Sequence, residues 1–384
     1  MAPLLIVGSG LAGITLAREF RKLDKQAPLA LITSDDGAYY SKPTLTNALC
    51  YGKGTAQLVI APREYLAAQL GAEILAHTLV GRILPDEHAL ETSAGRLGYR
   101  KLVLAVGAHP IRLPLQGDGV TDVLSVNNLA GYARFRERLN TAGGKVAILG
   151  AGLIGCEFAN DLRSIGIETS LFDLAPQPLG RLLPPQAAAY YRVKLEANGI
   201  VFFCDTCIVR ITREKQGYRL SDNHGAEYCA DIVLSAVGLN PATELAQGAG
   251  LKIQRGIVVD KRLCTSDPDI FALGDCAEVS GLVLPYVMPI MQAAAPLAKI
   301  LASASNGTAE VTYPAMPVVV KTPACPAVVC LPPLGVEGIW RETVNGTGVR
   351  AVFENAAGKP IGFALIGDAI REKQALAAQM PAWL

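Results

Sequence analysis

The sequence predicts an α/β protein with more than one domain. The chain has 384 residues, which is too long for one compact core and suggests two or three domains. Hydrophobic residues make up 51% of the chain and charged residues 18%, so large buried sheets can form. A strand–glycine–helix pattern near the N-terminus recurs later in the chain. This repeat predicts sheets that are covered by helices.

The repeat pairs "PLLIVGSGLAGITLAREFRKL" with "KVAILGAGLIGCEFANDLRSI", and its glycines align without a gap. Each copy has apolar strand residues, a G-x-G-x-x-G run and an amphipathic helix, which predicts two Rossmann-like dinucleotide-binding domains. The first glycine makes the tight turn, the second lets a pyrophosphate approach the backbone, and the third lets the helix pack on the strand. The phosphates should meet the helix N-terminus. The residues expected to bind them are Gly8, Ser9, Gly10, Leu11, Ala12 and Gly13, and then Gly150, Gly152, Leu153, Ile154 and Gly155.

Each unit should end its second strand with an acidic residue for the adenosine ribose. In the first unit the strand "LALIT" is followed by Ser34, Asp35 and Asp36. Asp35 is the ribose candidate, with Ser34 beside it, and an acidic turn is the alternative. In the second unit Asp173 ends the strand "TSLFD". A carboxylate there would repel the 2′-phosphate of NADP, so NADH is the expected donor. Arg181 nearby leaves a weaker use of NADPH open.

Two similar segments follow the two units. "KLVLAVGAHP" contains Ala105 and Gly107, and "LVLSAVGLNP" contains Gly238. The first resembles the A-T-G-x-x-P segment of flavin reductases, with Val106 where Thr is usual. We expect the chain to cross between domains at both segments. Ordinary glycine turns are the alternative.

The segment "TSDPDIFALGDCAE" resembles the second flavin motif of the same superfamily. It places Gly274 and Asp275 directly after a buried strand. The Asp275 carboxylate should then accept hydrogen bonds from flavin ribityl hydroxyls, and a turn aspartate is the alternative reading. We expect a helix after Pro289, with its N-terminus toward the flavin, so that the helix dipole stabilises the anionic reduced form. Val287 and Met288 are expected to contact the flavin ring through their backbone, and a plain core position is the alternative.

Composition excludes several other classes of function. The formal net charge of +1 gives no bulk argument for binding nucleic acid or a membrane. "PLLIVG" is predicted as a buried strand rather than a signal peptide, and no apolar run is long enough to span a bilayer.

Nine cysteines scattered through an α/β pattern suit reduced thiols in the cytoplasm. Cys204 and Cys207 form one CxxC, which we expect to be two buried thiols. No metal site is predicted.

Taken together, the chain resembles the flavoprotein pyridine-nucleotide reductases, and among them the bacterial rubredoxin reductases. The phrases "YYSKPTLT", "LGAGLIGCEFANDL", "ALGDCAEV", "YVMPIM" and "VKTPACP" carry this resemblance. It implies a glutathione-reductase-like fold: two Rossmann-like domains followed by a small α+β domain. The implied layout is an FAD-binding domain over residues 1–110 and 240–309, an NAD(P)H-binding domain over 111–239, and a C-terminal domain over 310–384.

The same resemblance implies roles for further residues. Val80 would lie near the adenine, and Lys42 and Pro43 against the flavin. Glu157 would sit between flavin and nicotinamide, and Lys321 would reach the ring from the third domain. Lys42, Glu157 and Lys321 are therefore the candidate catalytic residues. Relatives that serve other iron–sulfur partners commonly have Lys where this chain has Asn47, paired with the glutamate. Lys42 or Lys321 could supply that charge instead.

The position of the usual redox cysteines predicts the electron acceptor. Disulfide reductases of this superfamily have one or two cysteines where this chain reads Ser41, Lys42 and Pro43, and the nearest cysteine is Cys50. Flavin alone can take a hydride and release single electrons. The missing thiol therefore predicts that the flavin passes electrons on directly. The resemblance implies that they go from NADH through FAD to rubredoxin, a small acidic iron protein, without stable membrane association.

Other acceptors remain open from the sequence. One alternative is an NADH:ferredoxin reductase of a multicomponent oxygenase. A second is an NADH oxidase or disulfide reductase that lacks the usual cysteine. A quinone-reducing dehydrogenase would need an amphipathic segment that binds the membrane, and the C-terminal "QALAAQMPAWL" is too short to form one. A non-enzymatic nucleotide sensor is disfavoured, because a complete NADH site lies beside a complete FAD site.

Overall fold

The first Rossmann-like unit is built on a parallel sheet of buried strands. The structure is a computed structural model that describes residues 2–303 and 308–384. Met1 and residues 304–307 fall within the expected FAD-binding ranges 1–110 and 240–309 but lie outside the described residues. The strand order is β20 (Ile270–Ala272), β9 (Lys101–Leu104), β1 (Leu4–Val7), β2 (Leu29–Ile32) and β5 (Glu73–Leu75). Helices α1 (Leu11–Leu23), α3 (Arg63–Leu70) and α8 (Val287–Ala302) accompany it, and α1 packs against both α3 and α8.

The second unit repeats this plan in the middle of the chain. Its parallel sheet has the order β13 (Ile200–Phe203), β12 (Glu168–Phe172), β11 (Lys145–Leu149) and β17 (Ile232–Ser235). Its helices are α4 (Leu129–Ala142), α5 (Leu153–Ser164) and α6 (Pro185–Ala197). A three-stranded antiparallel sheet of β14 (Ile208–Arg213), β15 (Tyr218–Asp222) and β16 (Glu227–Ala230) extends from it. Strands β1, β2 and β20 of the first sheet are apolar and buried along their whole length, as expected where both faces are covered, and β11 of the second is buried from Val146 to Leu149.

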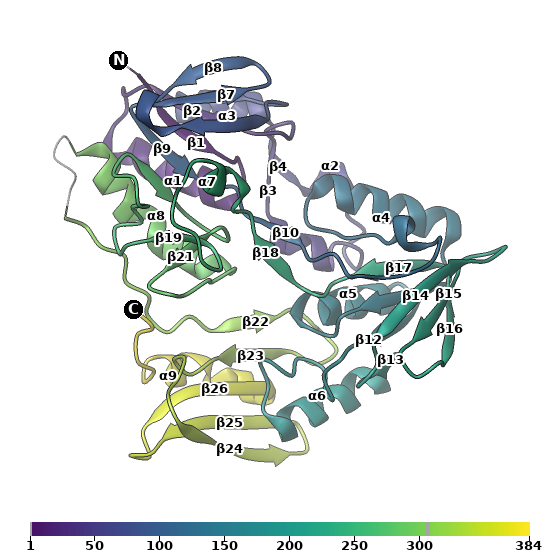
Figure 1. Cartoon of the computed structure of the whole chain (residues 1–384). Coiled ribbons are helices and arrows are strands. Elements are labelled where there is room, and N and C mark those ends of the chain that lie inside the picture. The colour runs from purple at the N-terminus through teal and green to yellow at the C-terminus, as the bar shows by residue number, and fades with distance from the viewer. Residues whose placement is uncertain (1, 304–307) are drawn as a thin grey trace.

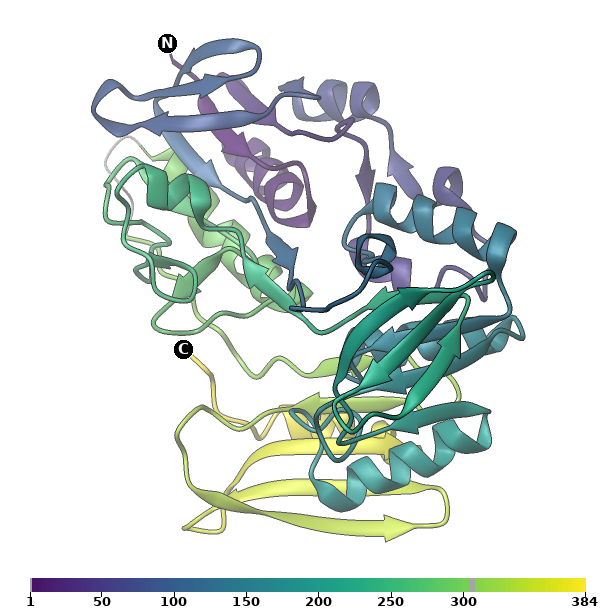
Figure 2. The ribbon, with the colours of Figure 1, turned by 45° about the vertical axis from the view of Figure 1, so that its right-hand side comes forward.

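The C-terminal part is an antiparallel sheet with short helices at its end. The order is β22 (Val318–Val320), β23 (Ala327–Cys330), β26 (Pro360–Gly367), β25 (Gly348–Asn355) and β24 (Gly338–Asn345). The 3₁₀ helix η4 (Asp368–Glu372) and α9 (Lys373–Ala377) follow. Helix α6 packs beside this sheet, as the teal helix beside the yellow strands in Figure 2.

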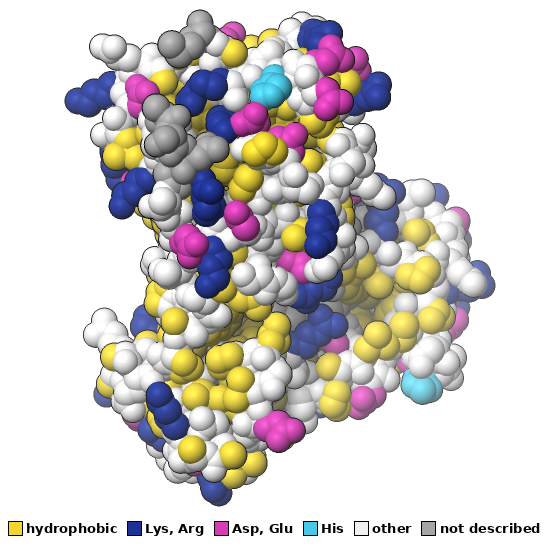
Figure 3. Space-filling view, turned by 60° about the vertical axis from the view of Figure 1, so that its left-hand side comes forward, with side chains coloured by type: hydrophobic (Ala, Val, Ile, Leu, Met, Phe, Trp, Pro, Cys, Tyr) yellow, Lys and Arg dark blue, Asp and Glu magenta, His cyan; other side chains and the backbone are white. Residues whose placement is uncertain are grey.

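Short elements connect these parts. They are β3 (Tyr39–Tyr40), η1 (Lys42–Asn47), α2 (Thr55–Leu58), β4 (Val59–Ala61), β6 (Val80–Leu84), η2 (Pro85–Glu87), β7 (Ala89–Thr92), β8 (Gly95–Gly98), β10 (Ala108–Pro110), η3 (Val120–Asp122), β18 (Leu239–Pro241), α7 (Glu244–Gly248), β19 (Ile257–Val259) and β21 (Ala277–Val279). Strands β10 and β18 pair antiparallel, so the chain leaves and re-enters the first unit at one place. The molecule therefore has three parts, and its surface is hollowed where they meet, with hydrophobic side chains gathered over the lower lobe (Figure 3).

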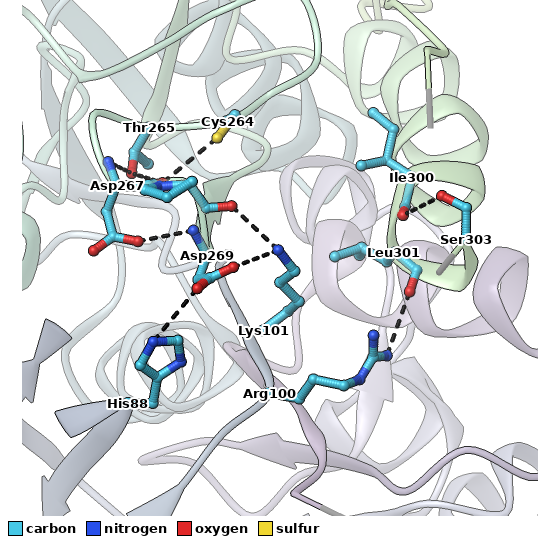
Figure 4. A network of polar contacts seen from close by, with 11 residues as sticks. His88, Arg100, Lys101, Cys264, Thr265, Asp267, Asp269, Ile300, Leu301 and Ser303 are labelled. Carbon is cyan, nitrogen blue, oxygen red and sulfur yellow. Dashed lines mark hydrogen bonds and ion pairs between the residues drawn. The ribbon is translucent and has the colours of Figure 1, made fainter. Parts of the chain in front are cut away.

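A polar network closes the end of the first sheet where strands β9 and β20 begin (Figure 4). Lys101 and His88 both contact the Asp269 carboxylate, with His88 Nε2 3.4 Å from Oδ2. The Arg100 guanidinium donates to the carbonyl oxygen of Leu301 at 3.3 Å. These contacts tie the β6–β8 sheet and the end of α8 to the parallel sheet. They lie at the amino ends of the strands, whereas the glycine loops lie at the carboxyl ends.

Two local predictions are corrected by the structure. Helix α8 begins at Val287, two residues before Pro289. A proline is tolerated there because amides of the first helical turn have no intrahelical acceptor. Cys204 and Cys207 are partly exposed rather than buried, because they lie in the turn after β13, where Asp205 has a φ of 53°. All nine cysteines lie in the described ranges and are free thiols.

Candidate functional site

The first glycine loop is shaped by close backbone contacts. Gly8 has a φ of 115°, and a Cβ there would lie 2.2 Å from the carbonyl oxygen of Ala105. A Cβ at Gly13 would lie 2.0 Å from the carbonyl oxygen of Gly8. In contrast, no atom of the described residues lies within 4 Å of a Cβ built on Gly10. The outer two glycines are therefore required by packing, and the middle one faces open space at the start of α1.

The second loop has the same geometry. Gly150 has a φ of 104°, and a Cβ on Gly155 would lie 1.9 Å from the carbonyl oxygen of Gly150. Around Gly152, the described part of the chain again leaves 4 Å clear. Neither α1 nor α5 has an acidic residue in its first turn, so the backbone amides there meet no competing carboxylate. Both loops fit a dinucleotide pyrophosphate at a helix N-terminus.

The acids at the second strand ends differ in their surroundings. The Asp173 carboxylate accepts hydrogen bonds from Ala151 N at 2.5 Å and from Ala175 N at 2.8 Å. It therefore lies directly against the second glycine loop, as a ribose acceptor would need to. Asp35 and Ser34 follow β2 on the exposed rim of the first sheet. Arg181 is exposed in the segment between β12 and α6.

Opposite charges face each other at the first site. Asp275 follows β20 and is half-buried. Burial raises its pKa, and the nearby Lys42 ammonium opposes that shift. Burial likewise lowers the pKa of Lys42, against the pull of Asp275. Both shifts have desolvation as the main cause, and each group counters the shift of the other.

Glu157 is the point where the three parts of the molecule meet. It lies on α5, has 0% exposure, and accepts a hydrogen bond from the backbone N of Lys321 at 2.8 Å. Lys321 Nζ lies 2.9 Å from Glu157 Oε2, and Thr46 Oγ1 donates to the same oxygen at 2.5 Å. Lys321 Nζ also donates to the carbonyl oxygen of Pro43 and to Thr46 Oγ1. Of the two lysines left open by the sequence, Lys321 is the one that pairs with Glu157.

The remaining predicted residues lie around these two loops. Ser9 (8% exposed) and Ala12 (8%) are buried within the first loop. Ala105 is buried beside Gly8, and Gly107 follows it with a φ of 74°. Val80 is buried at the start of β6. Of the other expected residues, Leu11, Leu153 and Gly274 are half-buried, and Ile154, Gly238 and Val287 are exposed.

Three residues that sequence reasoning missed complete the junction: Thr46, Asn160 and Asp161. Asn160 and Asp161 are buried, at 6% and 1% exposure. A signal was present, because they stand three and four residues after Glu157 and so share its face of α5. Polar residues on a buried helix face need partners inside the protein.

The usual redox-cysteine position carries no thiol in this chain. Ser41, Lys42 and Pro43 occupy it, and Cys50 lies beyond the end of η1. Cys50 Sγ contacts the carbonyl oxygen of Asn47 at 3.1 Å. Partial burial of the thiol, together with the Asp161 carboxylate, raises the pKa of Cys50 to about 11. Such a thiol holds its proton at neutral pH and is a poor nucleophile.

Comparison with known proteins agrees with this geometry. Residues 2–300 match the pyridine nucleotide-disulphide oxidoreductase family model, and the chain belongs to that family. Residues 310–380 match the rubredoxin binding C-terminal domain.

Among the described residues, no helix combines the length and the apolar character that a membrane crossing requires. No group of three or more His, Cys, Asp or Glu side chains in those residues could hold a metal ion.

Two relatives that align over nearly their whole length share one named activity. The chain is 46% identical to the rubredoxin-NAD(+) reductase of Acinetobacter baylyi, over 96% of this chain and 94% of that protein. It is 44% identical to the rubredoxin-NAD(+) reductase of Alcanivorax borkumensis, over 100% and 99%. A solved ferredoxin reductase from Rhodopseudomonas palustris has a TM-score of 0.88 and 26% identity, covering 99% of this chain and 96% of that one. These matches confirm the fold and family expected from the sequence.

The glycine loop generates a prediction on stability. Gly13→Ala should lower the free energy of unfolding of the flavin-free protein by about 3 kcal/mol, because its Cβ would overlap the Gly8 carbonyl oxygen. Gly10→Ala, in the same loop, should change it by less than about 1 kcal/mol but weaken FAD binding. Urea denaturation and FAD titration measure the two effects. Equal destabilisation by both variants would contradict this account of the loop.

Proposed function

We propose that this chain is an NADH-dependent, FAD-containing rubredoxin reductase, an oxidoreductase of electron transport. The observation that carries the proposal is the junction at Glu157. There the second nucleotide-binding unit, the segment over Lys42 and Pro43, and the domain that matches the rubredoxin-binding model meet through direct hydrogen bonds. The names of the full-length relatives support the same acceptor.

The two glycine loops divide the cofactors between them. We assign FAD to the first unit and NADH to the second, with residues 1–110 and 240–309 as the FAD-binding domain, 111–239 as the NAD(P)H-binding domain and 310–384 as the third domain. The support is that the first sheet draws its strands from both ends of that discontinuous range. The proposed FAD residues are Gly8, Ser9, Gly10, Leu11, Ala12, Gly13, Ser34, Asp35, Lys42, Pro43, Val80, Ala105, Gly107, Gly274, Asp275, Val287 and Lys321. The proposed NADH residues are Gly150, Gly152, Leu153, Ile154, Gly155, Glu157, Asp173 and Gly238.

When bound, FAD supplies the step between hydride chemistry and single electrons. The chain's own residues supply position and charge. Glu157 fixes the Lys321 ammonium by an ion pair within a buried hydrogen-bond network. Lys321 and Lys42 then place positive charge beside the site, which favours the reduced, negative form of a bound flavin. One NADH supplies two electrons, reduces two rubredoxin molecules and releases one proton.

The free state of the cysteines bears on where in the cell the protein works. Nine free cysteines suit a reducing compartment, so we propose that the protein works in the cytoplasm.

Nucleotide preference is the first test of this function. Asp173→Asn removes the charge that repels a 2′-phosphate, so the ratio of kcat/KM for NADH over NADPH should fall by about tenfold. Asp205→Asn is the matched control, because Asp205 is an exposed aspartate in the neighbouring turn. Steady-state kinetics with ferricyanide measures both. A wild-type protein that prefers NADPH would refute the reading of Asp173.

Independence from thiols is the second test. Cys50→Ser, Cys204→Ser and Cys207→Ser should each keep at least about half of the NADH-dependent electron transfer, since no thiol relay is used. Stopped-flow reduction of rubredoxin by each folded variant measures this. Loss of activity in any one of them would revive a cysteine-based mechanism.

The acceptor itself is the third test. NADH-driven reduction of rubredoxin should be faster than reduction of ferredoxin in a side-by-side assay. Its rate should fall as salt rises through physiological strength, where the Debye length is about 8 Å, because an acidic partner is steered by surface lysines. Lys and Arg side chains stand beside the hollow in Figure 3.

Paired charge reversals separate docking from chemistry. Lys53→Glu, in the segment after η1, should slow rubredoxin reduction by about threefold or more and leave ferricyanide reduction unchanged. Lys215→Glu, in the β14–β15 hairpin, is the control for net charge. A ferredoxin reduced many times faster than rubredoxin would move the assignment to a ferredoxin reductase.

A further inference from the structure

The inward face of α5 carries three buried polar side chains in succession. Glu157, Asn160 and Asp161 have exposures of 0%, 6% and 1%. Their spacing of three and four residues puts them on one side of the helix. This strip belongs to the second nucleotide-binding unit, but every partner described below lies in another part of the molecule.

Asp161 holds the segment that follows η1. Its Oδ2 accepts from Leu49 N at 2.9 Å, and its Oδ1 accepts from Cys50 N at 2.9 Å. Both carboxylate oxygens are thus used on two consecutive backbone amides of the first unit. The residue is buried, and burial is the main cause that raises its pKa, opposed by these two amides. An ionised carboxylate in such a place is tolerated because its donors are already fixed.

Asn160 holds the third part of the molecule in the same way. Its Oδ1 accepts from Ala324 N at 3.1 Å, in the turn between β22 and β23. That turn begins with Lys321, whose backbone N is held by Glu157. One face of α5 therefore hydrogen-bonds both a segment of the first unit, at Leu49 and Cys50, and a loop of the C-terminal part, at Lys321 and Ala324.

The two segments that α5 holds contact each other through Lys321. Lys321 Nζ, from the C-terminal loop, contacts the Pro43 carbonyl oxygen and Thr46 Oγ1 of the segment that Asp161 holds. Moving either segment relative to α5 would displace the ammonium from Glu157.

We infer that Asp161, together with Asn160, is a positioning residue of the electron-transfer site: it locks residues 42–50 and 321–324 onto α5 so that the Lys321 ammonium stands at a fixed place beside the flavin. This inference rests on the proposed function, because it assigns the flavin to the first unit. Asp161 acts through Lys321 and through the segment after Lys42, without touching the cofactor.

Asp161→Asn is the direct test, because the side chain keeps its shape but can accept from only one of the two amides. In the flavin-free protein, backbone hydrogen exchange in residues 44–53 should become about tenfold faster. In the holoenzyme, kcat with NADH should fall by about tenfold while the KM for NADH stays within about twofold. The flavin midpoint potential should become more negative, because positive charge is less firmly held near the reduced flavin.

Asp222→Asn is the matched control. Asp222 is also buried and accepts from the backbone amides of His224 and Ala226 at Oδ1 and from the Tyr228 hydroxyl at Oδ2, but in the β15–β16 hairpin. Asn there keeps the acceptor for the two amides and loses the one for the hydroxyl. It should speed exchange locally and leave kcat and the flavin potential unchanged. If Asp161→Asn behaves like Asp222→Asn, its role is structural and the inference is overturned.

A double-mutant cycle tests the route through the lysine. In a Lys321→Met background, Asp161→Asn should lower kcat by less than about twofold further, because the group that it positions is gone. Full additivity would overturn the inference. Should Asp161→Asn fail to fold, Asn160→Ala tests the Lys321 side with the same readouts and the same cycle.

The acceptor assignment can fail separately. A wild-type protein that reduces ferricyanide but not rubredoxin would refute the proposed acceptor. The flavin potentials of the wild type, Asp161→Asn and Asp222→Asn would still decide the positioning role.

Discussion

The carboxylate of Glu157 has no contact with solvent, so its charge must be satisfied by donors inside the protein. It finds them in Lys321 N and Nζ and in the Thr46 hydroxyl, each from a different part of the fold than α5. A buried ion pair of this kind adds little net stability, because desolvating both charges offsets their attraction. Its effect is geometric, since removing one partner would leave the other buried and uncompensated. The ion pair therefore brings contacts from all three parts of the fold to one buried carboxylate.

The two Rossmann-like units show how one local design serves two sites. The glycine loops have nearly the same φ at the first glycine and the same close approach at the third. What distinguishes the units lies outside the motif. The first has Asp275 and Lys42 close enough that the charge of each opposes the pKa shift that burial gives the other. The second has Asp173 bound to the amide of its own loop. The two units thus share their loop geometry and differ in the charges around it.

The site has no thiol relay, and its charge arrangement is completed by the C-terminal domain instead. Cys50 is a free thiol, and desolvation together with the nearby Asp161 carboxylate raises its pKa. The C-terminal sheet instead contributes one lysine to the centre of the molecule, immediately after β22. The same domain that matches the rubredoxin-binding model therefore also completes the charge arrangement of the site.

The sequence by itself determined the two glycine loops, their helices and their parallel sheets, because these depend on short-range backbone sterics that a motif records directly. The spacing from the second glycine loop also singled out Asp173, and the resemblance to a known family, rather than any local spacing, pointed to Glu157 and Lys321. Only the tertiary structure decided between Lys42 and Lys321 as the partner of Glu157. Lys321 stands 164 residues beyond Glu157, and nothing local indicates that the two meet.

For the same reason, Thr46, Asn160 and Asp161 were missed, since their partners lie in segments that come together only on folding. The start of α8 and the exposure of Cys204 and Cys207 were also misjudged. Both depend on the conformation of a single turn, where several backbone conformations are compatible with the same residues.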